Sequence, residues 1–219
     1  MSRVLDAKGK NLRAVSTQLK EMITADGKEV TVKNAAHLHG LCGGLKSGEI
    51  TIKGNSGDYL GVLNDGALIR VTGNAGKYVA DNMTRGAVLV DGDADYGAGQ
   101  YCYGGTVVVK GSAGDFTATM NKGAIVIIGQ DVGNEVGTYM LAGDLVIVGN
   151  AGHNLGNYLI RGNIYVGGQW ASLGHNIKEE TLTEADVDKL QGYLVKYAIE
   201  ADPRAFHKLA PLSAKPFYK

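Results

Sequence analysis

Residues 137–149 read Gly-Thr-Tyr-Met-Leu-Ala-Gly-Asp-Leu-Val-Ile-Val-Gly, a short apolar run enclosed by glycines, and this arrangement recurs along the chain. A second glycine series opens the runs, and from its second member onward an apolar residue stands three positions earlier: Leu63, Met83, Cys102, Met120, Met140 or Leu159. The closing glycines are about 19 residues apart, at Gly54, Gly73, Gly92, Gly111, Gly129, Gly149 and Gly168. A fixed period of this length is typical of a solenoid.

Each run predicts one strand that points two side chains inward. These are four and two positions before the closing glycine: Ile50/Ile52, Ile69/Val71, Val88/Val90, Val107/Val109, Ile125/Ile127, Leu145/Ile147 and Ile164/Val166. All but one are β-branched, and alternate strand positions share a face. One strand per 19 residues is too frequent for βαβ units. We therefore predict an all-β fold, a right-handed parallel β-helix of about 7–8 single-stranded rungs, with the first, degenerate rung at Val30 and Val32.

The segments outside the repeat are expected to cover the ends of the solenoid, because exposed terminal strands would pair with other chains. Apolar residues at helical spacing predict an amphipathic capping helix over about 10–25, ending at Asp26-Gly27. A Thr183–Asp186 capping box predicts a second helix to about Ile199, followed by an extended tail from Pro203. We divide the chain into an N-terminal arm and capping helix (1–28), a β-helix domain (29–176), and a C-terminal helix and tail (177–219).

Glycines at the corners are expected to hold backbone conformations that other residues avoid. Aromatic residues past the closing glycines, Tyr59, Tyr78, Tyr96 and Phe116, predict a partial ring stack. In later rungs we expect aliphatic packing in its place, at Val136 and Leu155.

Charge and composition narrow the classes of partner. The chain has 219 residues with 22 basic and 22 acidic side chains, so bulk charge favours neither nucleic acid nor an anionic membrane. Its longest nearly uncharged apolar run, 124–129, is far too short to span a bilayer, and the polar start has no signal-peptide core. Cys42 and Cys102 have no metal-type spacing, so both are expected to be reduced. These features predict a cytoplasmic protein without a membrane or nucleic-acid partner.

Three motifs could carry chemistry, and each has a simpler interpretation. Gly97-Ala-Gly99 lacks the βαβ unit of a dinucleotide site. His37 and His39 alternate but have no third ligand at suitable spacing. The acidic cluster Asp91, Asp93 and Asp95 could support glycosidase or lyase chemistry, although a solvated turn explains it better. We therefore assign no catalytic, cofactor-binding or metal-binding residue.

The outward positions of the later rungs form the remaining candidate site. They are polar in early rungs, as at Thr51 and Arg70, but become apolar higher up: Val108, Val126, Ile128, Val146, Val148 and Tyr165. A contiguous apolar patch of this kind is usually covered. Either the C-terminal helix or a partner subunit is expected to cover it, which makes these residues the candidate interface.

The repeat Gly137-x-x-Met140-x-x-Gly143-x-Leu145-x-Ile147-x-Gly149 resembles the GXGXG family, the β-helical C-terminal domain of the glutamate synthase large subunit. The resemblance runs from about Leu12 to Gly174. At other turns Ala80 and Thr117 replace the first glycine, and His175-Asn176 departs from the expected sequence after Gly174. The tail that follows resembles the stand-alone middle subunit of three-subunit glutamate synthase-like enzymes, including the N-methylglutamate synthase type.

The resemblance implies a noncatalytic structural subunit that scaffolds an amidotransferase-like subunit and an FMN-binding synthase subunit. FMN and an iron–sulfur cluster would then belong to a partner subunit, and this chain would bind no cofactor. The β-helical subunit of a formylmethanofuran dehydrogenase-type complex shares the fold and is the alternative. A free-standing β-helix enzyme acting on polysaccharide is a more distant one. The substrate amine, the electron donor and the stoichiometry stay open.

Overall fold

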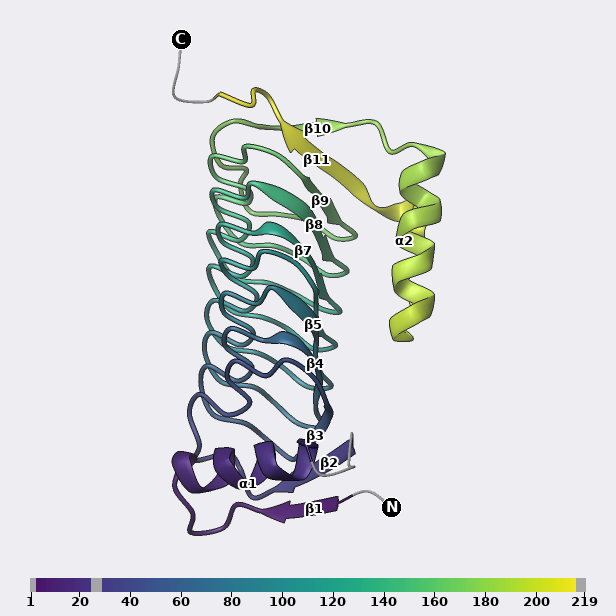
Figure 1. The fold of residues 1–219 in the computed structure, drawn as a ribbon. Helices are drawn as coiled ribbons and strands as arrows, with labels where there is room; N and C mark the ends of the chain where they lie inside the picture. The colour runs from purple at the N-terminus through teal and green to yellow at the C-terminus, as the bar shows by residue number, and fades with distance from the viewer. Residues whose placement is uncertain (1–2, 25–28, 216–219) are drawn as a thin grey trace.

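In the computed structural model, described for residues 3–24 and 29–215, the chain winds into a parallel β-helix that contributes one strand per turn (Figure 1). The order in the sheet is β1 to β9, then β11 and β10. The strands from the first to the sixth are β1 (Arg3–Asp6), β2 (Glu29–Lys33), β3 (Glu49–Lys53), β4 (Asp65–Val71), β5 (Arg85–Val90) and β6 (Thr106–Val109). Then follow β7 (Lys122–Ile128), β8 (Ala142–Ile147), β9 (Asn163–Val166), β10 (Ile177–Glu180) and β11 (His207–Pro211). The solenoid predicted from the repeat is confirmed.

The inward pairs of six of the seven predicted rungs, and Val30 and Val32 of the first rung, lie buried in one continuous core. The rung of β7 is the exception. Val107 pairs in register with Val126 and Val109 with Ile128, so Val126 and Ile128 point inward, and Ile125 and Ile127 point outward. The prediction for this rung was wrong because it was counted from Gly129. The residue that closes this turn is Gln130, whose N–H bonds to Gly111 and whose carbonyl accepts from Gly149.

A similar shift affects the interior slot before two strands. The predicted occupants Leu63 and Met120 lie outside the core, Leu63 with an exposed fraction of 57%, and the fully buried residues are Asn64 and Asn121. Asn64 Oδ1 accepts from the N–H of Ala67 at 3.0 Å and its Nδ2 donates to the carbonyl of Ala67 at 2.9 Å. Asn121 makes the same two bonds with Ala124. Because these bonds satisfy a polar side chain in the core, the apolar criterion chose the wrong residue.

A ladder of short polar side chains explains five of the seven closing glycines, all except Gly54 and Gly129. Asn74 Oδ1 accepts from the N–H of Asp93 on the next turn at 3.0 Å, and Asp93 Oδ1 accepts from Ser112 at 2.8 Å. A Cβ at Gly92 would lie 2.1 Å from Asn74 Oδ1, and one at Gly111 equally close to Asp93 Oδ1. At these two positions glycine is therefore required by the side chain below it, and φ is not positive. The opening glycines do have the expected positive φ, from 83° at Gly105 to 150° at Gly123.

Another corner of each turn uses the left-handed backbone region mostly without glycine. At the corner of one turn Tyr59, Gly61 and Leu63 have φ of 56°, 67° and 57°, and this alternation recurs in each turn up to Tyr158. The N–H of Tyr59 donates to Lys77 on the next turn, and that of Gly61 donates to Leu41 on the previous one. These inter-turn bonds hold a conformation that costs a non-glycine residue about 1–2 kcal/mol.

Ring stacks follow two corners of the solenoid. The predicted stack is confirmed, with ring centroids 4.8 Å apart for Tyr59–Tyr78, 5.4 Å for Tyr78–Tyr96 and 5.1 Å for Tyr96–Phe116. It does not continue at Val136 and Leu155, because both point into the core. A second stack of Tyr139, Tyr158 and His175 was not predicted.

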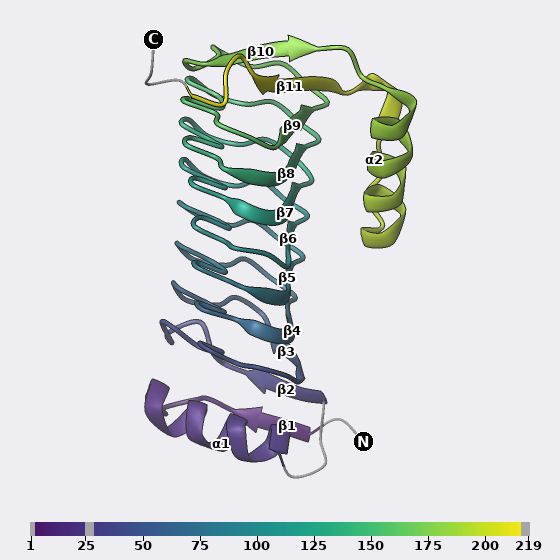
Figure 2. The same ribbon diagram turned by 45° about the horizontal axis from the view of Figure 1, so that its top comes forward.

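Both ends of the solenoid are covered by the chain itself. At the start, Val15 and Leu19 of helix α1 (Leu12–Thr24) are buried against the core. The predicted end of this helix at Asp26-Gly27 lies outside the described residues. At the other end, β11 runs antiparallel between β9 and β10 (Figure 2). The expected tail thus contains a short 3-10 helix (Pro203–Ala205) and a strand.

Candidate functional site

The outward side chains of the sheet form columns along the solenoid, because the parallel strands are in register. The central column contains Val4, Thr31, Thr51, Arg70, Leu89, Val108, Ile127, Val146 and Tyr165. We call its part on β6–β9 the upper outer face and its part on β1–β4, with the neighbouring outward residues, the lower outer face. The two parts differ in what lies over them.

Helix α2 (Glu184–Tyr197) lies over the upper outer face (Figures 1 and 2). Val108, Ile127, Val146 and Tyr165 are at most 1% exposed and form one apolar cluster, whose other buried members are Leu190, Leu194 and Phe206. Of the six candidate interface residues, Val108, Val146 and Tyr165 are therefore buried by the chain's own helix, and Val148 packs at the edge of the cluster. Val126 and Ile128 lie in the solenoid core and are not part of this surface.

The start of α2 is fixed by the predicted capping box. The Thr183 hydroxyl accepts from the N–H of Asp186, and an Asp186 carboxylate oxygen accepts from the N–H of Thr183. The helix ends at Ala198, which adopts the left-handed conformation with its N–H bonded to the last turn. Both ends of the helix are thereby hydrogen-bonded.

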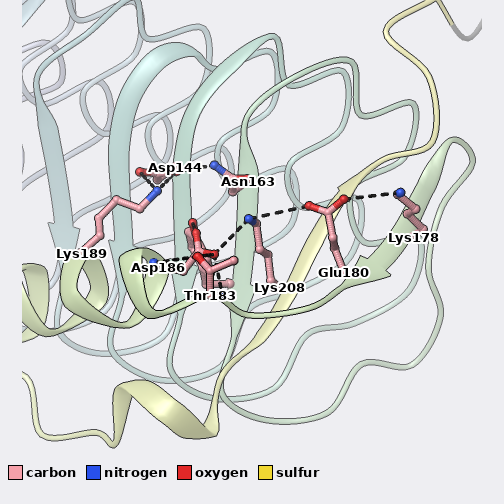
Figure 3. Close-up of polar contacts among 9 residues, drawn as sticks. Asp144, Asn163, Lys178, Glu180, Thr183, Asp186, Lys189 and Lys208 are labelled. Atoms are coloured by element: carbon pink, nitrogen blue, oxygen red, sulfur yellow. Dashed lines mark hydrogen bonds and ion pairs between the residues drawn. The ribbon is translucent and has the colours of Figure 1, made fainter.

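Asp186 also anchors α2 to the sheet through a buried polar cluster (Figure 3). Its carboxylate accepts from the Tyr165 hydroxyl at 2.6 Å and from Lys208 Nζ at 3.0 Å. Burial alone would raise the pKa of Asp186, but the donors from Thr183, Tyr165 and Lys208 outweigh it and hold that pKa well below its usual value. Burial, with the bond to Asp186, raises the pKa of the Tyr165 hydroxyl. The carboxylate stays ionised and the phenol neutral, which suits a structural hydrogen bond.

A second polar cluster ties the middle of α2 to β8. Asp144 accepts from the Tyr193 hydroxyl at 2.9 Å. It also accepts from Asn163 Nδ2 at 3.0 Å, and Lys189 Nζ lies 3.2 Å from its Oδ2 (Figure 3). Burial, and then the nearby Asp144 carboxylate, raises the pKa of Tyr193. Both clusters bring carboxylates, lysines and phenols together, yet the bonds they make join α2 and β11 to the sheet.

The sequence motifs that could carry chemistry do not converge in the structure. Asp91 is paired with Arg70 at 2.8 Å, Asp93 is part of the ladder, and Asp95 accepts from the N–H of Tyr96. His37 bonds to the carbonyl of Lys10, whereas His39 lies 3.2 Å from Asp58. In the described part of the chain no three His, Cys, Asp or Glu side chains are grouped as metal ligands. None of the described helices is long and apolar enough to cross a membrane.

The polar residues that hold α2 were not found from the sequence. Asp144 and Asn163 belong to the same outward column, beside the central one, and Asp186 was predicted only as a helix cap. A usable signal was present, because a carboxylate at an outward position next to an apolar column needs a partner when that column is covered.

The fold and these surfaces define a parallel β-helix closed by its own terminal segments, in which the buried carboxylates Asp144 and Asp186 attach α2 to the sheet. The chain belongs to the GXGXG family: the model of the GXGXG motif matches residues 10–206, most of the chain. Among curated proteins no match was found.

Proposed function

We propose that this chain is a noncatalytic structural subunit of a glutamate synthase-like complex of the glutamate or N-methylglutamate type. Membership of the GXGXG family, over residues 10–206, is the observation that carries the proposal. The resembling domain of glutamate synthases is structural and packs beside the glutaminase and FMN-binding domains. In this chain the same solenoid would hold an amidotransferase-like subunit against an FMN-binding synthase subunit in the cytoplasm.

The geometry supports a scaffold in two ways. Polar side chains that could act on a substrate, such as Asp93, Asp144 and Asp186, instead bond to neighbouring turns or to α2. The turns stack at about 4.8 Å each, so the rungs from Val30 to Val166 form a column roughly 34 Å long. A column of that length with a closed core offers rigid lateral surfaces to more than one partner.

Catalysis would then belong to the partner subunits. The amidotransferase-like subunit would release ammonia from glutamine, and the synthase subunit would carry FMN and an iron–sulfur cluster. This chain would contribute position only, by fixing the distance between the two centres.

Purification of the chain alone and together with the two subunits tests the proposal. Alone, it is expected to show no flavin absorbance and no stoichiometric metal, and to turn over neither glutamine nor 2-oxoglutarate. With both subunits it should co-elute, and leaving it out should abolish glutamine-dependent synthesis. A bound flavin or metal in the isolated chain, or full activity of the complex without it, would contradict the proposal. Co-elution with formylmethanofuran dehydrogenase subunits instead would assign the chain to that complex.

A further inference from the structure

The lower outer face carries two identical rows of charge. β2 reads Glu-Val-Thr-Val-Lys and β3 reads Glu-Ile-Thr-Ile-Lys. The two strands are in register, so Glu29 lies beside Glu49 and Lys33 beside Lys53. All four side chains are exposed, and within the described residues none of the four has an ion-pair partner.

This arrangement lowers the folding stability of the isolated chain. Neighbouring strands are about 4.8 Å apart, and like charges directly opposite each other across two strands repel. Asp6 stands below Lys33 in the same column, but its carboxylate is bonded to Asn34 and to the N–H of Lys8.

Higher on the sheet, charges of opposite sign are paired. Asp91 lies between Arg70 at 2.8 Å and Lys110 at 3.5 Å, so both cations are compensated. Uncompensated charge of like sign in adjacent strands is thus a property of the lower rungs.

The lower outer face is also open. Helix α2 ends at Tyr197, beside a hollow of about 240 Å³ that Arg70 and Leu89 help to line. A second hollow of about 340 Å³ lies next to Glu49 and Leu68. Two exposed large apolar side chains belong to this face, Val4 at 56% and Leu68 at 39%.

We infer that the lower outer face is the docking surface for one partner subunit, an inference that rests on the proposed function. The occupant is a protein surface with basic residues opposite Glu29 and Glu49, acidic residues opposite Lys33 and Lys53, and apolar side chains against Val4 and Leu68. Such a partner would relieve the repulsion within each column while it buries the apolar contacts. A polyanion does not fit, because the glutamates would face it.

A second copy of the chain does not fit either. With a twofold axis parallel to the solenoid, the glutamates of one copy would face the lysines of the other. The two α2 helices would then collide, because each stands on the same face as the charges (Figure 2). With a twofold axis along the strands the helices separate, but glutamate faces glutamate.

Exchanging the charges of one rung tests the inference. The double substitution Glu49→Lys with Lys53→Glu keeps the composition and makes both columns alternate in sign. At low salt the isolated variant should melt about 1–4 °C higher than the wild type, and the difference should vanish in 1 M NaCl. A variant that melts no higher than the wild type at low salt would contradict the repulsion on which the inference depends.

Assembly is the second measurement, with the amidotransferase-like and FMN-binding subunits as probes. The exchange should weaken binding of one subunit at least tenfold and leave the other unchanged. The control is Lys178→Glu with Glu180→Lys on β10, a pair of exposed side chains at the opposite end. Because Lys208 Nζ lies 3.7 Å from Glu180, limited proteolysis first checks that α2 stays in place in this variant, which should then bind both subunits normally. A complex that forms equally well with the Glu49/Lys53 exchange overturns this docking surface alone. A wild-type chain that binds neither subunit overturns the proposed function, and a dimer that the exchange dissociates would show the occupant to be a second copy.

Discussion

The upper and lower outer faces have the same backbone and differ in their outward side chains. On the upper face Ile127 and Val146 are fully buried below α2, whereas Thr31 and Thr51 of the same column remain partly exposed on the lower face. The strand spacing and the core below are alike in the two regions. The outward residue at each rung therefore decides whether the chain closes a face itself or leaves it available.

Introducing a carboxylate on each face should give the largest difference in unfolding free energy between the two faces. Val146→Asp would bury a carboxylate without a partner below α2, so we expect a loss of about 3–5 kcal/mol in unfolding free energy and release of α2. Thr51→Asp in the same column should cost less than about 1 kcal/mol. Denaturant unfolding and limited proteolysis of α2 measure both effects. Equal denaturant midpoints for the two variants would contradict the conclusion that the upper outer face is buried and the lower outer face is open.

Truncation of an apolar side chain should give the next largest difference. Ile127→Ala removes buried contacts with Val108, Val146 and the helix, and should cost about 2–4 kcal/mol. The control is Leu68→Ala on the lower face, where the side chain is already 39% exposed and the cost should be within about 1 kcal/mol. If Leu68→Ala were as costly as Ile127→Ala, the lower face would be closed in solution.

Acid should distinguish the carboxylates of the two regions. Hydrogen bonds hold the pKa of Asp186 below its usual value, and Arg85 with Thr84 lowers the pKa of Asp65 on β4 to about 2. Each contributes stability that is present above about pH 4 and is lost as the pH falls through the folded-state pKa. High salt should weaken the contribution of Asp65, whose side chain is 33% exposed, more than that of the buried Asp186. Unfolding at pH 2–6 in 0.05 and 1 M NaCl, with Asp65→Asn and Asp186→Asn, measures the two; identical salt sensitivity would contradict the burial of Asp186.

The smallest effect is expected at the boundary between the two faces. Arg70→Gln breaks an ion pair whose arginine is about half exposed, and should change the unfolding free energy by no more than about 0.5 kcal/mol at physiological salt. Thermal unfolding at two salt concentrations is sufficient. A loss above 2 kcal/mol would mean that Arg70 holds the end of α2 in place.

The repeat predicted the solenoid and most inward residues, because a 19-residue period places equivalent residues at the same position of every turn. The two helices were predicted from helical spacing and a capping box outside the repeat. The prediction failed in the rungs where a different residue type occupies one of the repeated positions. Asn64 and Asn121 replace an apolar side chain by bonding to the backbone three residues later, and Gln130 replaces a closing glycine. The inward residues of β7 were counted back from the nearest glycine, Gly129, instead of from the position 19 residues after Gly111. The prediction for this rung was therefore shifted by one position, and Val126 and Ile128 were placed on the wrong face.

The additional strands at the two ends had no comparable signal. β1 has four residues and β11 enters the sheet antiparallel between β9 and β10, so neither continues the period. The candidate site was predicted only as an apolar column that needed a cover. Asp144 could have been identified from its outward position beside that column, but its helix partners Lys189 and Tyr193 depend on which face of α2 meets the sheet, and a single sequence does not determine that angle.

The ladder of polar side chains implies that pairs of residues one turn apart must change together over evolution. Where the ladder residue is Asn or Asp, as at Asn74 and Asp93, glycine stands 18 positions later. Ser112 interrupts this ladder, and Gln130 stands in place of the glycine. In a second ladder Asp58 precedes Gly76 by the same interval, whereas Lys77 is followed by Asp95. The chain thus contains both combinations, Asn or Asp followed by glycine and another residue followed by a non-glycine residue. Related sequences should therefore change at the two positions together. Insertions or deletions within the solenoid should add or remove whole turns.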